Sequence, residues 1–258
     1  YETRIARLVE YNLEGYNATI LAYGQTGSGK THTILGNFDN HERGVIPRAL
    51  EDLFAKLNSE IDVEYSVSIQ FLELYGEEIR DLLTSSHSRL TIRDVGNDEP
   101  EVVGATQISI STAAEGIQIL QNGLLRRVTG ATAMNESSSR SHAILSLNVE
   151  QSKIENETVH IVRSKLCFVD LAGAERQKRT LATGKRLQEG IDINKGLSNL
   201  GNVISALGDP KKRGKTHVPY RDAKLTRLLR GSLGGNHKTL MIACISPASL
   251  SLSESVNC

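Results

Sequence analysis

A short glycine-rich segment, GQTGSGKT at residues 24–31, constrains the fold of this 258-residue chain more than any other feature. It fits the pattern G-x-x-x-x-G-K-S/T and follows an apolar run at residues 17–23, which predicts a strand, a loop and then a helix. Glycines let consecutive backbone N–H groups turn inward and surround phosphate oxygens. Lys30 would neutralise phosphate charge and the Thr31 hydroxyl would ligate Mg²⁺. The alternative is a glycine-rich turn; the context favours a nucleotide phosphate site made of Gly24, Gln25, Thr26, Gly27, Ser28, Gly29, Lys30 and Thr31.

A second motif follows the apolar segment at residues 159–169, which predicts another strand. Residues 170–175 read DLAGAE. An aspartate at the end of a strand, here Asp170, can hold Mg²⁺ through water, and Gly173 can offer its N–H to a γ-phosphate. The pattern D-x-x-G also occurs in ordinary turns, but its place after a phosphate loop favours a segment that senses the nucleotide.

A third motif, NESSSRSH at residues 135–142, lies between a predicted helix and a predicted strand. Its hydroxyls, amide and arginine are too polar for a core and too specific for a flexible linker. A solvated loop capped by serines is the alternative, and the two motifs above favour a role beside the phosphates.

Helical and strand patterns alternate along the whole chain, without an internal repeat or a long linker. This pattern predicts one α/β domain, with a central mixed, mainly parallel sheet covered by helices on both faces. Apolar spacing predicts helices near residues 5–13, 46–57, 112–128 and 193–207. Strands are predicted at residues 17–23, 63–71, 143–149, 159–169 and 239–245.

The formal net charge is zero, but the charges are segregated. Residues 51–101 have a net charge of −9, whereas residues 176–186 carry +5 and residues 209–230 carry +6. Basic segments that share a face would favour a polyanionic partner. No apolar run approaches the ~20 residues of a membrane span. Cys167 and Cys244 lie in apolar runs, as buried reduced thiols do, which predicts a reducing intracellular compartment.

These motifs, in this order, resemble the kinesin motor domain. The similarity covers essentially the whole chain, so that residues 1–258 are expected to form one motor domain with a P-loop NTPase fold. The wording LGNVISALGD and SLGGNHKTLMIACISP is similar to the chromokinesin-like branch. The blocks that carry the resemblance are GYNATILAYGQTGSGKTHT, IQFLELYGEEIRDLL, NESSSRSH, DLAGAER, INKGLSNLGNVISAL, HVPYRDAKLTRLLRGSLGGN and MIACISP.

The resemblance implies roles for individual residues. In kinesins the serines at the positions of Ser138 and Ser139 contact the γ-phosphate and Mg²⁺, and the residue at the position of His32 lies near the adenine. Arg140 is expected to pair with Glu175 when ATP closes the loops, which helps to position the attacking water. The resemblance thus implies ATP and Mg²⁺ as cofactors, with the metal held at Thr31, Ser139 and, through water, Asp170.

The resemblance also implies tubulin as the partner, because kinesins bind its acidic surface through a helix like that at residues 191–207 and through the flanking loops. The contact candidates are Lys178, Lys211, Lys212, Arg213, Lys215, Tyr220, Arg221, Lys224 and Arg227. A solvated helix face is the alternative for any single lysine. A nucleic acid is not expected, because no aromatic platform interleaves with the basic residues. We expect no membrane contact and a place on cytoplasmic microtubules, with oligomerisation through regions outside this chain.

Some features depart from the family pattern. Ala174 stands where kinesins usually have serine, and Ser137 where histidine is common; neither is expected to supply an indispensable group. Compared with the family pattern, we expect the N-terminal strand that flanks the adenine, and the C-terminal helix with the neck linker, to be absent from residues 1–258. We therefore expect a domain truncated at both ends, an exposed edge at the strand predicted for residues 239–245, and weaker nucleotide binding.

The predicted function is microtubule-stimulated ATP hydrolysis that drives movement. The alternative is a kinesin-like module that holds microtubules without turnover, but a degenerate motor is expected to lose Lys30, Thr31, Arg140, Gly173 or Glu175, and all are present. A GTPase is disfavoured because the chain has no N-K-x-D motif to read guanine.

Overall fold

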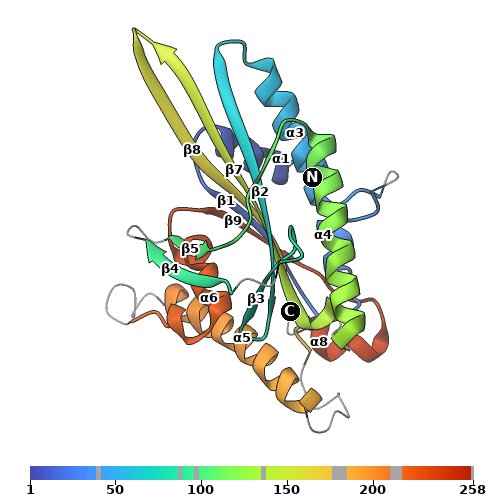
Figure 1. The fold of residues 1–258 in the computed structure, drawn as a ribbon. Coiled ribbons are helices and arrows are strands. Elements are labelled where there is room, and N and C mark those ends of the chain that lie inside the picture. Colours follow the sequence, from blue (N-terminus) through green and yellow to red (C-terminus); the bar gives the residue numbers. More distant parts are fainter. Residues whose placement is uncertain are drawn as a thin grey trace.

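The computed structural model describes residues 1–38, 42–86, 89–95, 99–134, 138–175, 185–209 and 217–256. Figure 1 shows a long twisted sheet with helices on both sides, and strands that extend beyond the helices at one end. This arrangement confirms the predicted α/β class.

The helices and strands alternate along the chain as the sequence pattern predicts. The helices are α1 (Ile5–Leu13), α2 (Lys30–Ile34), α3 (Val45–Ser59), α4 (Ala113–Met134), α5 (Lys185–Gly208), α6 (Lys224–Leu228), α7 (Arg230–Gly234) and α8 (Leu252–Val256). The strands are β1 (Ala18–Tyr23), β2 (Val63–Tyr75), β3 (Glu78–Asp81), β4 (Thr91–Val95), β5 (Glu99–Val103), β6 (Ile108–Ile110), β7 (Ser141–Glu155), β8 (Thr158–Asp170) and β9 (Lys238–Ala243). Short 3₁₀ turns lie at Ser138–Arg140, Tyr220–Asp222 and Ser249–Ser251.

The main sheet has seven strands in the order β3-β2-β7-β8-β1-β9, with β6 paired to β2. It is mixed, as predicted, but the expectation of a mainly parallel sheet is wrong. Within the described residues β1 pairs in parallel with β8 and β9. The pairs β2–β3, β2–β6, β2–β7 and β7–β8 are antiparallel.

The antiparallel part arises from one long hairpin, β7–β8. Its turn residues Asn156 and Glu157 have φ angles of 49° and 63°, the left-handed conformation that joins twisted antiparallel strands tightly. The polar composition of residues 150–158 hid this extension, since the sequence pattern ends one strand at residue 149 and starts the next at 159. Two strands that the sequence pattern separates are therefore the arms of one antiparallel ribbon.

Helices cover the two faces of the sheet with separate apolar clusters. On one face α1, α3 and α4 pack over a core that includes Leu50, Phe71 and Phe168. On the other, Leu200 of α5 and Leu225 of α6 meet a smaller cluster on the sheet. Figure 1 shows α3 and α4 on the side of the sheet opposite to α5 and α6.

The strands β4 and β5 form a separate two-stranded sheet beside α6. The strand β9, which lies at one end of the main sheet order, pairs only with β1 among the described strands. Met241 of β9 is 42% exposed, in line with the exposed sheet edge predicted for this segment. No helix in the described part of the chain is both long and apolar enough to cross a bilayer.

Candidate functional site

The predicted phosphate loop joins the end of β1 to the start of α2, which confirms the strand, loop and helix expected around GQTGSGKT. Gly29 precedes the helix with a left-handed φ of 93°, a conformation that side chains with a Cβ rarely adopt. A Cβ on Gly24 would lie only 2.2 Å from the carbonyl oxygen of Cys244 on the neighbouring segment. The absence of a side chain at Gly24 therefore lets the loop pass close to the backbone of Cys244, just after β9.

Lys30 is 7% exposed and faces the inside of this loop. Its Nζ donates hydrogen bonds of 2.8 Å to the carbonyl oxygens of Gly24 and Gln25. The Oγ of Ser28 and the Oε1 of Gln25 are buried and have no hydrogen-bond partner in the structure. The Lys30 ammonium group and the Ser28 hydroxyl are donors that fit a phosphate group, whereas Gln25 Oε1 can only accept a hydrogen bond.

Two of the three predicted metal ligands, Thr31 and Asp170, also lie together, while the metal contact of the Ser139 hydroxyl stays a prediction. The Thr31 hydroxyl donates a 2.8 Å hydrogen bond to Oδ2 of Asp170, although the two residues lie 139 positions apart in the chain. Asp170 is 3% exposed, and its other oxygen, Oδ1, has no hydrogen-bond partner in the structure. A buried carboxylate oxygen beside a hydroxyl matches the oxygen ligands that Mg²⁺ prefers.

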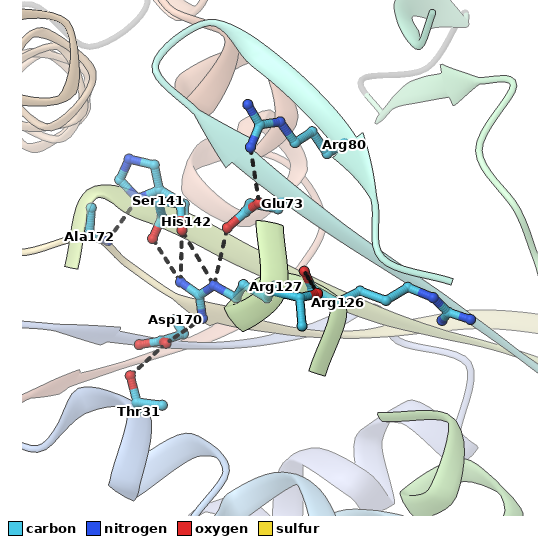
Figure 2. A network of polar contacts seen from close by, with 10 residues as sticks. Thr31, Glu73, Arg80, Arg126, Arg127, Ser141, His142, Asp170 and Ala172 are labelled. Carbon is cyan, nitrogen blue, oxygen red and sulfur yellow. Dashed lines mark hydrogen bonds and ion pairs between the residues drawn. The ribbon is translucent and has the colours of Figure 1, made fainter. Parts of the chain in front are cut away.

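A buried arginine that the sequence reasoning did not select holds Asp170 from the other side (Figure 2). Arg127 of α4 is 4% exposed; its Nη1 lies 3.2 Å from Asp170 Oδ2 and its Nε lies 3.3 Å from Glu73 Oε1. Its Nη2 donates to the backbone oxygen of Ser141 at 2.9 Å. Arg127 of α4 thus contacts residues of β2, β7 and β8 beside the Thr31–Asp170 hydrogen bond.

A signal for Arg127 exists in the sequence. It stands seven positions after the fully buried Leu120 and so falls on the same face of the helix. The apolar pattern instead pointed to Val128, which is 57% exposed. An arginine at a core position of a helix is therefore the signal that was missed.

His142, in the third motif, ties this motif to the second one. Its Nδ1 accepts a 3.0 Å hydrogen bond from the backbone N–H of Ala172. Burial, with the nearby cations Arg127 and Lys30, lowers the pKa of His142 to about 3. The ring is therefore neutral at physiological pH and keeps Nδ1 free of a proton, as the contact with Ala172 requires.

The segment after Asp170 lies against the phosphate loop. Thr26 donates to the Glu175 carboxylate through its backbone N–H at 2.9 Å and its hydroxyl at 2.5 Å. The Gly173 N–H donates to the backbone oxygen of Ser139 at 2.8 Å. A Cβ on Gly173 would lie 2.3 Å from both Thr26 Oγ1 and Glu175 Oε2, so a side chain there would have to push both of these groups aside.

Three more residues are predicted for the nucleotide site: Arg140, Ser138 and His32. Arg140 is described, but its expected pairing with Glu175 stays a prediction, since Glu175 here contacts Thr26. The side chain of Ser138 lies outside the described part of the chain. His32 is exposed on α2, and its place near an adenine stays a prediction.

The basic candidates divide into two groups. Lys178, Lys211, Lys212, Arg213 and Lys215 lie outside the described residues. Arg221 is 73% exposed and lies 3.2 Å from Asp94 of β4, and Arg227 lies 3.1 Å from the same carboxylate. Hydrogen bonding from Arg227 leads the causes that lower the pKa of Asp94.

The other two described candidates, Tyr220 and Lys224, contact other neighbours. The Nζ of Lys224 donates to the backbone oxygen of Glu77. The ring of Tyr220 lies 5.6 Å from the guanidinium of Arg230. The structure therefore brings Tyr220, Arg221, Lys224 and Arg227 together beside the β4–β5 sheet, while their proposed contact with tubulin stays a prediction.

Comparison with known proteins gives a consistent result. A family model described as the kinesin motor domain matches residues 1–258. The chain is 49% identical over 265 residues to the chromosome-associated kinesin KIF4 of Mus musculus, and 46% identical over 272 residues to the kinesin-like protein KIF27 of Homo sapiens. Both alignments cover 100% of this chain but only 21% and 19% of the relatives, so the chain spans about a fifth of their length.

A solved structure also matches closely. It is described as that of a fast kinesin, with implications for its ATPase mechanism and its interactions with microtubules. The TM-score is 0.90 at 41% sequence identity, and the match covers 99% of this chain and 72% of that one. The similarity to KIF4 agrees with the chromokinesin-like wording of the sequence.

Proposed function

This chain belongs to the kinesin motor-domain family, and we propose that it hydrolyses ATP with Mg²⁺ and uses the reaction to move along microtubules. The observation that carries the proposal is the convergence on the phosphate loop. Thr31 contacts Asp170 and Thr26 contacts Glu175, so the second motif reaches both the metal side and the phosphate side of the loop.

Each part of the site has a chemical task in this proposal. Lys30 and the loop N–H groups would bind the phosphates, and Thr31 and Asp170 would hold Mg²⁺, the latter through water. When bound, the ion neutralises charge on the β- and γ-phosphate oxygens. Since little covalent chemistry is needed, the protein contributes mainly by orienting water and phosphate and by stabilising the spreading charge.

The segment after Asp170 would act as the γ-phosphate sensor. Its Gly173 N–H donates to Ser139 in the structure, and Glu175 occupies the N–H of Thr26. Binding of a γ-phosphate would require Gly173 to exchange the Ser139 oxygen for a phosphate oxygen. It would also release Glu175 toward Arg140, the pairing expected from the resemblance.

We propose microtubules as the partner because basic side chains gather near α6, and tubulin is acidic. Arg221, which is largely exposed, and the basic segments at residues 176–186 and 209–230 support this. The protein would then act on the microtubule cytoskeleton; relatives named chromosome-associated kinesins indicate that chromosomes are a second place to look for it. The competing function is a module that holds microtubules without turnover.

Phosphate release from ATP, measured on the intact protein with and without polymerised tubulin, tests this function. We expect strong stimulation by microtubules that Glu175→Ala abolishes, whereas Glu64→Ala, at an exposed position on β2, leaves it intact. Tight microtubule binding without stimulated turnover would contradict the motor and establish the static module.

A further inference from the structure

A chain of hydrogen-bonded polar side chains connects the β4–β5 sheet to β1. Glu99, the first residue of β5, contacts Nε2 of His237 through its Oε1. On the other side of the ring, Nδ1 of His237 shares a 2.8 Å hydrogen bond with the hydroxyl of Thr19 in β1. Thr19 in turn shares a 2.8 Å hydrogen bond with the Ser232 hydroxyl of α7.

Two of these groups, His237 and Thr19, are almost fully enclosed, and a third, Glu99, is partly exposed. The His237 side chain is 4% exposed and Thr19 is completely buried, while the Glu99 side chain is 30% exposed. A Cβ on Gly231 would lie 2.9 Å from Nε2 of His237 and 3.2 Å from Cγ of Glu99, so the backbone of α7 packs closely against the pair. Burial of an imidazole is uncommon unless its ring nitrogens have partners, and both nitrogens of His237 have one here.

Two further side chains contact Glu99, one just before β1 and one in β8. Nδ2 of Asn17 donates to it at 2.6 Å, and Nζ of Lys165 in β8 lies 3.9 Å from its Oε2. Burial raises the pKa of Glu99, but His237, Lys165 and Asn17 outweigh this, and the pKa is lowered overall. The carboxylate therefore stays ionised at neutral pH and attracts its donors strongly.

The β4–β5 sheet has a second attachment, of a different kind. Asp94, near the end of β4, contacts Arg221 and Arg227, which are among the basic side chains proposed to face the microtubule. Nη2 of Arg227 also donates to the backbone oxygen of Ile92 at 3.2 Å. The contacts of Asp94 set β4 against α6, whereas those of Glu99 set β5 against the main sheet.

We propose that Glu99 and His237, with Thr19, form a latch that fixes the β4–β5 sheet to β1, the strand that leads into the phosphate loop. Glu99 and His237 are positioning residues: the latch presents β4, Arg221 and Arg227 to the acidic partner as one rigid surface. The role in microtubule binding rests on the function proposed above, whereas the attachment itself does not.

Graded variants of Glu99 in the intact protein test the latch. Glu99→Ala removes all acceptor oxygens, Glu99→Gln keeps one oxygen for His237 and Asn17, and Glu101→Gln removes a charge from the exposed position two residues along β5. The first readout is amide hydrogen exchange of residues 91–95 and 99–103 without microtubules. The second is the microtubule concentration that half-activates the ATPase, with the basal rate measured alongside.

We expect exchange in the β4–β5 sheet to become about tenfold faster in Glu99→Ala, since a lost hydrogen bond to a charged group has roughly that effect. The half-activating microtubule concentration should rise about fivefold while the basal rate stays unchanged, Glu99→Gln should be intermediate, and Glu101→Gln should behave as the wild type. His237→Ala should reproduce Glu99→Ala.

Unchanged exchange in Glu99→Ala overturns the latch. An equal effect of Glu101→Gln also overturns it, because charge rather than attachment would then be responsible. A basal rate that falls as much as the activated rate refutes the positioning role. If microtubules do not activate the wild type, the proposed function fails, while hydrogen exchange still decides whether the latch exists.

Discussion

Replacing Arg127 by leucine tests whether the buried cation holds the nucleotide site together. Counted over side-chain atoms alone, the exposed fraction is 3% for Arg127, 9% for Glu73 and 4% for Asp170, so all three side chains are almost fully enclosed. Arg127→Leu fills similar space but leaves two buried carboxylates without this cation. Removal of one partner of a buried ion pair costs about 3–5 kcal/mol.

The lower end of this range applies here, because both carboxylates keep another contact. Asp170 retains the Thr31 hydroxyl, and Glu73 retains Arg80 at 3.9 Å. We therefore expect a loss of about 3 kcal/mol in the free energy of unfolding, a large part of the ~5–15 kcal/mol that stabilises a typical protein.

Urea unfolding measures the effect, with an unchanged slope showing that the compactness of the two states is preserved. Arg126→Leu is the matched control (Figure 2), because the neighbouring arginine is exposed and loses one hydrogen bond to the Leu82 carbonyl, which is worth about 1 kcal/mol. Adding Glu73→Gln to Arg127→Leu should recover part of the loss, since one uncompensated charge disappears. A loss below about 1 kcal/mol, or one equal to that of Arg126→Leu, would refute the reasoning.

Three further predictions concern the same site. Between about pH 6.5 and pH 3, His142 is protonated in the unfolded chain but neutral in the folded protein, so the free energy of unfolding should fall by about 1.4 kcal/mol per pH unit as the pH drops. The change in this free energy between pH 7 and pH 5, measured by urea unfolding, should be smaller in His142→Asn than in the wild type, and an unchanged difference would contradict this. Gly173→Ala should lower microtubule-stimulated turnover about a hundredfold, because its Cβ would displace the Thr26 and Glu175 side chains and crowd the N–H proposed to reach the γ-phosphate; turnover near the wild-type level would show that the loop adjusts. Thr31→Ala should raise the Mg²⁺ concentration for half-maximal ATP turnover about tenfold, measured by titration after chelation, and an unaltered titration would remove Thr31 from the metal site.

Features that depend on neighbouring residues were predictable from the sequence. The phosphate loop is one, because its strand, its glycines and Lys30 follow one another directly and local geometry suffices to form it. The main amphipathic helices are another, since their period appears in consecutive residues. The helix predicted near residues 112–128 also has a local start signal: the Glu115 N–H donates a 3.1 Å hydrogen bond to Thr112 Oγ1.

The sheet direction and the deeper part of the site depended on the tertiary structure. Polar residues hid the β7–β8 ribbon, because a strand that extends beyond its helices need not be apolar. The motif sequences also did not show that Gly173 would donate to Ser139, or Glu175 accept from Thr26, since these contacts depend on how the loops settle on one another.

By itself, the sequence determined which chemistry we propose for this chain: the phosphate loop, the aspartate proposed for the metal and the glycine proposed as sensor are recognisable from residue type and order. Only the tertiary structure decided what holds these groups in place. Arg127 lies 43 positions from Asp170 and 54 from Glu73, and Glu99 lies 138 from His237. No local pattern records such pairs, because packing of the whole chain brings them together and burial then makes each depend on its partner.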